Sequence, residues 1–161
     1  SKRQSIEVAE QEVPELETPG LRKLPLAAGV VALVGLADSV YLAVKHFTAE
    51  PVPCSLVEGC EKVLTSPYAE VVGVPIAAAG AAAYFIAFAL AVLAAYGDGR
   101  MWKLFGGLAT LMAGFSLWLI YLQAAVIGAF CQFCLISAAT SLTLFLIFLT
   151  SALISKETSM K

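Results

Sequence analysis

Four long apolar segments constrain the fold of this chain more than any other feature of its sequence. Each is long enough to cross the hydrocarbon core of a bilayer, which takes about 20 residues of helix. Hydrophobic residues make up 60% of the chain and charged residues only 14%, whereas soluble domains carry roughly a quarter charged residues. The sequence therefore predicts an all-α integral membrane protein, a bundle of four transmembrane helices that span about residues 24–47, 75–96, 104–128 and 131–154.

Polar sequence flanks these segments on both sides. Residues 1–22 are acidic and read as a disordered tail, residues 23–155 form the membrane domain, and residues 156–161 form a short second tail. A largely polar stretch of more than twenty residues precedes the first apolar segment, which is also longer than the apolar core of a signal peptide. We therefore expect that segment to remain as a membrane span.

Lysine and arginine are distributed unequally between the two sides of the predicted bundle. The positive-inside rule assigns the richer side to the cytoplasm, so both termini and the short loop between the second and third spans are predicted to be cytoplasmic. The net charge of −2 argues against a nucleic-acid partner, and the sequence has no stripe of basic residues that would argue for one. Eight of the ten basic residues lie on the predicted cytoplasmic side, and two on the other: Lys2, Arg3, Arg22, Lys23, Arg100, Lys103, Lys156 and Lys161 against Lys45 and Lys62.

All four cysteines of the chain fall on the predicted outer side. Cys54 and Cys60 lie in the outer segment between the first two spans, and Cys131 and Cys134 open the fourth span after a tight turn. In a bacterial cell this side is the oxidising periplasm, where disulfides form and persist. The clustering predicts redox chemistry on one face of the membrane.

The spacing of the cysteines indicates how they act. Cys131 and Cys134 are three residues apart, so they share one face at the start of a helix, where the unpaired amides favour a thiolate and lower the thiol pKa. Cys60 forms a short apolar stripe with Val63 and Leu64, which predicts a short amphipathic helix in the outer loop. Cys54 lies between prolines on an extended and exposed stretch.

Three other classes of protein compete with a redox enzyme. A structural zinc site is disfavoured because five residues separate Cys54 from Cys60, outside the usual two to four, and we predict no metal. A non-enzymatic protein with two structural disulfides, Cys54–Cys60 and Cys131–Cys134, remains an alternative, although bridging one helical turn gives little loop-closure stabilisation. A transporter would need polar groups in several spans.

A few polar and aromatic residues inside the spans are candidates for a ligand pocket. Asp38 is a carboxylate within the first span, and such groups are functional candidates by default. Alternatively, Asp38 pairs with Ser39, Tyr121 or Gln123 and fixes helix packing. Trp118 and Tyr121 either border a pocket or belong to an interfacial aromatic belt.

Four motifs together resemble a known family. They are "CSLVEGC" at residues 54–60, a serine six residues later at Ser66, "GVPIAAAG" at residues 73–80, and "CQFC" at residues 131–134. This set is similar to the vitamin K epoxide reductase family in its bacterial branch, over about residues 24–154.

The resemblance implies an integral-membrane thiol oxidoreductase whose four core helices surround a quinone, either ubiquinone or menaquinone. It implies that Cys54 exchanges with a periplasmic thioredoxin-fold partner of the DsbA type, and that Cys60 passes the reducing equivalents to Cys131. Cys134 is then the thiolate that faces the quinone, with Ser66 in or beside the pocket. Such a protein supports disulfide-bond formation.

The resemblance also sets the expected location and the remaining alternative. The chain is expected in the bacterial inner membrane, with the cysteines on the periplasmic side, and Asp38, Trp118, Tyr121 and Gln123 complete the predicted quinone site. Animal members carry a tyrosine four residues after the second cysteine of the CxxC motif, where this chain has Ala138. This departure from the animal pattern argues against reduction of a vitamin K or quinone epoxide, which is the alternative activity and not the main expectation.

Overall fold

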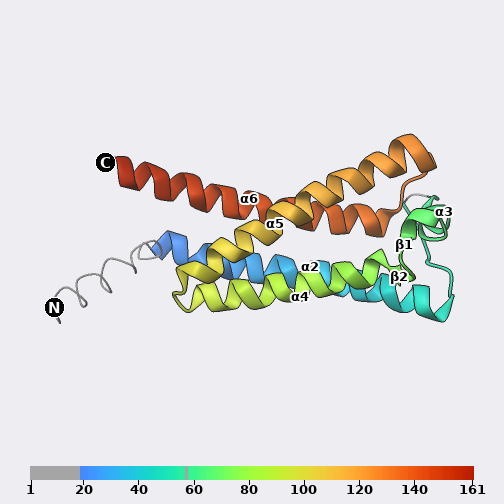
Figure 1. Ribbon diagram of the computed structural model, residues 1–161, viewed down its shortest axis with the longest axis horizontal. Coiled ribbons are helices and arrows are strands. Elements are labelled where there is room, and N and C mark those ends of the chain that lie inside the picture. Colours follow the sequence, from blue (N-terminus) through green and yellow to red (C-terminus); the bar gives the residue numbers. More distant parts are fainter. Residues whose placement is uncertain (1–18, 57) are drawn as a thin grey trace.

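Four long helices run along the length of the molecule (Figure 1). The structure is a computed structural model that describes residues 19–56 and 58–161. All four helices are long and apolar enough to cross a membrane, which confirms the predicted fold class. They are α2 (Pro19–Thr48), α4 (Ile76–Ala95), α5 (Gly99–Tyr121) and α6 (Gln132–Met160), and α5 continues directly into a π-helical segment, Leu122–Ile127.

The observed helices extend beyond some of the predicted boundaries. α2 begins at Pro19, before the predicted start of the membrane domain at residue 23, and α6 continues to Met160, past the predicted end of its span at 154. The rest of the predicted acidic tail, residues 1–18, lies outside the described residues. Polar residues at the end of a helix can extend it into water without a change in the apolar part that crosses the bilayer.

Small side chains let α2 and α4 pack closely along their length. Ala28 and Ala32 on α2 are fully buried together with Ala87 and Ala91 on α4. In a membrane, where the lipid is as apolar as the protein, such close contact drives helix association. At the other side of the bundle the Trp102 indole donates a hydrogen bond of 3.0 Å to Ser151 Oγ, which joins α5 to α6.

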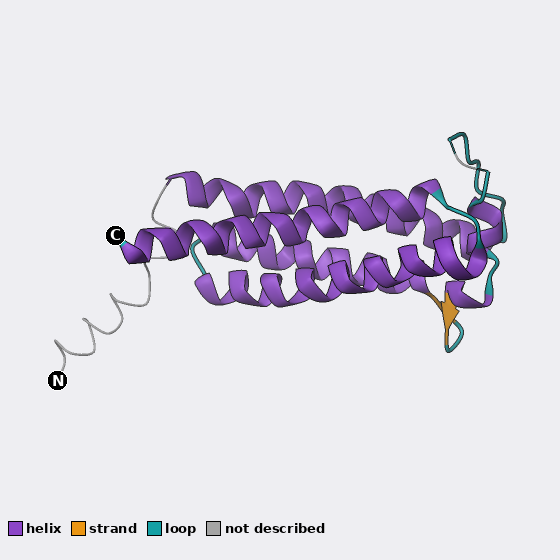
Figure 2. Cartoon of the chain, turned by 90° about the horizontal axis from the view of Figure 1, so that it is seen from above, coloured by secondary structure: helices purple, strands orange, loops and turns teal. Residues whose placement is uncertain are grey.

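The short elements of the chain gather at one end of the bundle (Figure 2). They are α3 (Cys60–Leu64), a 3-10 turn (Pro67–Ala69) and a small hairpin of β1 (Glu70–Val71) and β2 (Val74–Pro75). The helix α3 confirms the short amphipathic helix expected from the sequence, because its buried residues are Cys60 and Val63. The hairpin was not expected, and it turns through Val72 and Gly73, both with positive φ.

A hydrogen bond joins the hairpin to the bundle. His46 Nε2, near the end of α2, lies 2.6 Å from Glu70 Oε1 on β1. The outer elements thus form a cover that is tied to the helix ends. This cover carries two of the four cysteines.

Candidate active site

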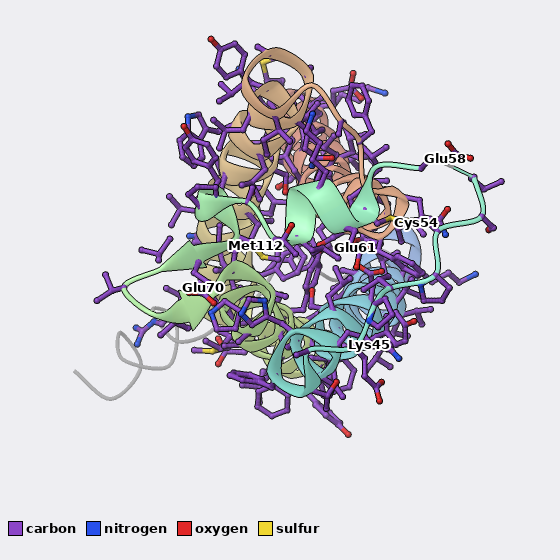
Figure 3. All side chains as sticks on the ribbon, turned by 90° about the vertical axis from the view of Figure 1, so that its right-hand side faces the viewer. Lys45, Cys54, Glu58, Glu61, Glu70 and Met112 are labelled. Carbon is purple, nitrogen blue, oxygen red and sulfur yellow. A yellow bond between two sulfur atoms is a disulfide. The ribbon has the colours of Figure 1, made fainter. Side chains whose placement is uncertain are left out.

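The four cysteines come together beneath the outer cover. Cys60 and Cys131 are buried in one small cluster, and Cys54 and Cys134 pack against it. Cys54 and Cys60 form a disulfide with their Cα atoms 6.2 Å apart, whereas Cys131 and Cys134 are free thiols. Figure 3 looks onto this end of the molecule and shows α3 lying across it, with Cys54 beside the helix.

A glycine allows the two cysteine pairs to approach each other. A Cβ atom on Gly59 would lie 2.4 Å from the carbonyl oxygen of Phe130 and 2.8 Å from its amide nitrogen, so only glycine fits at this point. Gly59 precedes Cys60 and Phe130 precedes Cys131. The close contact of these two backbones therefore brings the two sulfur-bearing residues into one cluster.

A second contact attaches the outer loop to the CxxC motif. Gln132, between Cys131 and Cys134, accepts a hydrogen bond of 2.8 Å from the amide of Leu56 through its Oε1. The Leu56 side chain itself is 85% exposed. The loop that carries Cys54 is thus held at the Leu56 backbone, while the Leu56 side chain is free of the bundle.

The CxxC pair lies at the start of α6, as its spacing predicted. Cys131 is the residue that caps α6, and its Sγ accepts a hydrogen bond of 3.4 Å from the amide of Cys134. A hydrogen bond from the Cys134 side chain lowers the pKa of the Cys131 thiol, and the amides of Cys134 and Phe133 add to this effect, although burial opposes it. The position of Cys131 at the start of α6, where its sulfur accepts from a main-chain amide, therefore favours its thiolate form.

A π-helical segment holds Gln123 against this pair. The segment ends at Gly128, which has a φ of 69°, and the Ala129 amide donates to the Gln123 carbonyl oxygen at 3.1 Å. The Gln123 side chain accepts a 3.0 Å hydrogen bond from the Cys131 amide through Oε1. Its Nε2 atom makes no hydrogen bond within the described part of the chain, so it is available as a donor. π-helical turns often occur at functional sites because they redirect one side chain.

A cavity of about 710 Å³ lies next to Cys134, between the four long helices and the outer cover. This volume is within the range of pockets that hold small organic ligands. Its wall is largely apolar, and the polar groups in it are few. Of the predicted site residues, Cys134, Ser66 and Gln123 line the cavity. Ser66 Oγ donates a 2.7 Å hydrogen bond to the Val63 carbonyl.

Three other predicted pocket residues do not line this cavity. Trp118 and Tyr121 are 50% and 60% exposed on the outside of the bundle, as lipid-facing side chains would be. Asp38 lies within α2, and its Oδ2 atom is buried with no hydrogen-bond partner among the described residues. The structure thus gathers the four cysteines, Ser66 and Gln123 in one place and leaves these three apart from the cavity.

Several cavity residues were not predicted from the sequence. Tyr84 on α4 lines the cavity, as do Ser137, Ala138 and Ser141 on α6. The serines follow Cys134 by three and seven residues, and helical spacing puts all three on one face. That spacing is a signal from which the serines were predictable, whereas nothing in the sequence distinguishes Tyr84.

The described residues contain no group of three or more histidine, cysteine or acidic side chains placed to hold a metal ion. The sulfur atoms of Cys54 and Cys60 are bonded to each other. Two of the four sulfurs are thus joined as a disulfide and the other two are thiols, the two functional groups between which thiol–disulfide exchange takes place.

Comparison with known proteins agrees with this geometry. The family model "Vitamin K epoxide reductase family" matches residues 26–149. The chain is also 34% identical over 122 residues to the "Thiol-disulfide oxidoreductase LTO1" of Arabidopsis thaliana, an alignment that covers 68% of this chain and 32% of that protein. The chain thus spans about a third of the length of this curated relative. With four apolar helices and the family's cysteine motifs, the chain is a multi-pass membrane protein that belongs to the vitamin K epoxide reductase family.

Proposed function

We propose that this protein is a membrane thiol–disulfide oxidoreductase that passes electrons from thioredoxin-fold proteins, through its two cysteine pairs, to a membrane quinone. The observation that carries the proposal is the order of the sulfurs. The Cys54–Cys60 disulfide lies in the outer cover, Cys60 and Cys131 share one buried cluster, and Cys134 lines the cavity. The four sulfurs thus form a series that begins in the outer cover and ends at the cavity inside the bundle.

In the first step a dithiol partner reduces the outer pair. A partner thiolate attacks Cys54, and the Cys54–Cys60 bond breaks with Cys60 as the leaving thiolate. The second thiol of the partner then attacks the mixed disulfide, so the partner leaves oxidised and Cys54 is released as a thiol. The exposed Leu56 beside Cys54 supports Cys54 as the sulfur that a water-soluble protein reaches.

In the second step the reducing equivalents move inward. The Cys60 thiolate attacks Cys131 of an oxidised Cys131–Cys134 pair, and Cys54 then resolves the mixed disulfide. The outer disulfide forms again, and the inner pair becomes a dithiol. The outer disulfide and inner dithiol of the structure correspond to the state after this transfer.

In the third step the inner dithiol is oxidised. A quinone in the cavity supplies a two-electron acceptor whose two oxygens take up protons. The Cys131 thiolate would then bond to Cys134 Sγ as the Cys134 S–H bond breaks. The sulfur pair would give up two electrons and its one remaining thiol proton, and the second proton is the one that Cys131 released when it ionised. The lowered pKa of Cys131 supports its role as the attacking sulfur at neutral pH.

The cavity residues fit the chemistry of a quinone. A largely apolar wall suits the ring and its hydrophobic tail, and a few donors suit its oxygens. The free Nε2 of Gln123 is such a donor in the cavity wall. Ser66 also lines the cavity, and its hydroxyl, which donates to Val63, would have to rotate to reach a ligand. We leave Asp38, Trp118 and Tyr121 out of the proposed site because they do not line the cavity.

The proposed setting is the bacterial inner membrane with the cysteine end in the periplasm. The excess of basic residues at the opposite end supports this orientation. The proposed partner is a periplasmic thioredoxin-fold protein of the DsbA type, and ubiquinone or menaquinone is the proposed acceptor. The name of the plant relative supports thiol–disulfide chemistry for the family.

Two cysteine variants of the purified chain test the proposal. Cys134→Ala should reduce quinone-dependent thiol oxidation to background, because the sulfur that faces the cavity is lost. Cys54→Ala should abolish oxidation of a thioredoxin-fold protein but preserve oxidation of a small membrane-permeant dithiol that reaches the inner pair directly. The measurement is the absorbance change of a water-soluble quinone under both thiol substrates.

Turnover of quinone by Cys134→Ala at the wild-type rate would refute the assigned order of sulfurs. A wild-type chain that oxidises neither thiol substrate in the presence of any quinone would refute the enzymatic function itself. A structural role for both disulfides would then be the better account.

A further inference from the structure

Four hydroxyl groups meet between α4 and α6, deeper in the bundle than the cysteines. The Tyr84 hydroxyl lies 2.6 Å from Thr140 Oγ1, 2.7 Å from Ser141 Oγ and 3.2 Å from Ser137 Oγ. It also lies 2.5 Å from the main-chain oxygen of Ser137. We call Tyr84, Ser137, Thr140 and Ser141 the hydroxyl cluster. Among apolar helices such a group of polar atoms is costly unless it is fully bonded or has a function.

The position of Tyr84 is fixed by its neighbours. The residue is 1% exposed, and its ring lies against Gly35 on α2, where a Cβ atom would come within 2.2 Å of the ring. No larger residue than glycine fits there without moving the ring. The tyrosine hydroxyl is thereby held at one point, from which it reaches α6.

The Tyr84 hydroxyl has more polar atoms within hydrogen-bonding distance than it can bond to at one time. A tyrosine hydroxyl has one hydrogen to donate and accepts at most two, so at most three of its four contacts are hydrogen bonds at one time. Thr140 has a second acceptor in the Ser137 carbonyl, at 2.7 Å. A serine hydroxyl of the cluster is therefore free to rotate toward another acceptor while Tyr84 stays bonded to the others.

The hydroxyl cluster faces the same cavity as the reactive sulfur. Tyr84, Ser137 and Ser141 line the cavity together with Cys134. At 1.5 Å of rise per residue, Ser137 and Ser141 lie about 4.5 Å and about 10 Å further along α6 than Cys134. Gln123 and Cys134 thus occupy the outer end of the cavity wall, and the hydroxyls occupy a level deeper in the membrane.

We propose that the hydroxyl cluster binds the quinone oxygen that lies away from Cys134, with Tyr84 as the anchor and Ser137 and Ser141 as the groups that contact the oxygen. This inference rests on the proposed function. The two oxygens of a para-quinone lie on opposite sides of its ring, so a site needs polar groups at two levels. Gln123 serves the outer level, and the hydroxyl cluster serves the inner one.

Rotating hydroxyls suit both redox forms of the ligand. A quinone oxygen only accepts hydrogen bonds, whereas the same oxygen in a quinol also donates one. A serine hydroxyl can donate to the first and accept from the second by turning about its C–O bond. The amide nitrogen of Gln123 can only donate. The two electrons and two protons still come from the Cys131–Cys134 dithiol.

Equilibrium binding to the oxidised chain tests this inference apart from turnover. The full chain is purified with its inner disulfide formed, so that it cannot reduce the ligand, and ubiquinone-1 and menadione are the probes. Tyr84→Phe and the double variant Ser137→Ala/Ser141→Ala should each bind both probes roughly 3- to 10-fold more weakly, the effect expected for a lost neutral hydrogen bond. Tyr96→Phe, at the exposed residue that caps the other end of α4, should bind like the wild type.

Reduction of the oxidised chain by dithiothreitol without quinone provides the structural check. Variants that keep the fold should react at the wild-type rate, so weaker binding with unchanged reduction supports the hydroxyl cluster as a ligand site. Wild-type affinity in the double serine variant would overturn the inference, whether or not Tyr84→Phe folds. If the wild type binds neither probe, the proposed quinone site fails as well, and this result differs from a loss confined to the variants.

Discussion

Asp38 carries a buried side-chain oxygen, Oδ2, that lacks a hydrogen-bond partner in the described part of the chain. It lies in a helix that is long and apolar enough to cross the membrane. The alternative expected from the sequence is a packing bond to Ser39, Tyr121 or Gln123, and no such bond to Asp38 Oδ2 is found among the described residues. Gln123 Oε1 accepts from Cys131 instead, and Tyr121 is exposed. A buried polar atom without a partner destabilises a protein.

Replacing this carboxylate by an apolar group should therefore stabilise the protein. We expect Asp38→Leu to raise the free energy of unfolding by about 1–3 kcal/mol, the typical cost of an unsatisfied buried group. Thermal or denaturant unfolding in detergent measures it. Asp98→Ala is the opposite control, because Asp98 caps α5 through a 3.1 Å bond from the Arg100 amide and its loss should destabilise by about 0.5–2 kcal/mol. A less stable Asp38→Leu variant would mean that the carboxylate has a partner.

Among the elements, the contact between α3 and the turn before α6 is the one on which the proposed function depends. The two pairs of cysteines belong to different elements, and the contact of Gly59 with Phe130 is what joins them. The disulfide and the loop would still form if this contact opened. The proposed electron transfer between Cys60 and Cys131 would stop, because thiol–disulfide exchange requires the two sulfur atoms to be in contact.

The variant Gly59→Ala should uncouple the two pairs. The added Cβ would lie 2.4 Å from the Phe130 carbonyl, so α3 must move outward. We expect quinone-dependent oxidation of a protein dithiol to fall at least about tenfold, since misplacing reacting groups by about 1 Å can cost about a hundredfold. Stopped-flow reduction of the outer disulfide alone should stay near the wild-type rate. Gly107→Ala is the matched control, because nothing lies within 4 Å of the new methyl group, and an equal loss in both variants would contradict this account.

At the scale of the whole molecule, the two ends of the bundle differ in chemistry. One end holds the outer cover and the cysteines, and the C-terminal end of α6 lies at the other (Figure 1). The basic residues of the described part of the chain follow the same division, six at the end away from the cysteines and two, Lys45 and Lys62, at the cysteine end. A fixed orientation in the membrane follows from this asymmetry.

Thiol labelling of intact cells tests the orientation. After mild reduction, a membrane-impermeant maleimide added from outside should label Cys54 in a variant whose other three cysteines are replaced by alanine. A single cysteine introduced by Ser159→Cys into a cysteine-free chain should react only after the membrane is opened. The reverse pattern would place the cysteine end in the cytoplasm and exclude a periplasmic partner.

The sequence was sufficient for the features that depend on composition and spacing. Long apolar runs predicted the four helices, and the Cys131–Cys134 spacing predicted a pair at a helix start. It was insufficient for the cavity wall, because lipid-facing and cavity-facing positions are both apolar in a membrane helix. Trp118 and Tyr84 therefore look alike in sequence, although one is exposed and the other buried. The β hairpin was not predicted because each of its strands has only two residues, too few to show an alternating pattern in the sequence.

The π-helical segment at the end of α5 has a consequence for how the family varies in length. A π-turn holds one more residue than an α-turn, so Leu122–Ile127 behaves as an α-helix that has absorbed an insertion. Deleting Ala124 would restore the shorter winding without breaking the helix, but it would swing Gln123 relative to the chain that follows. Homologues that lack this extra residue should therefore keep the same bundle and support their CxxC amide from a different position.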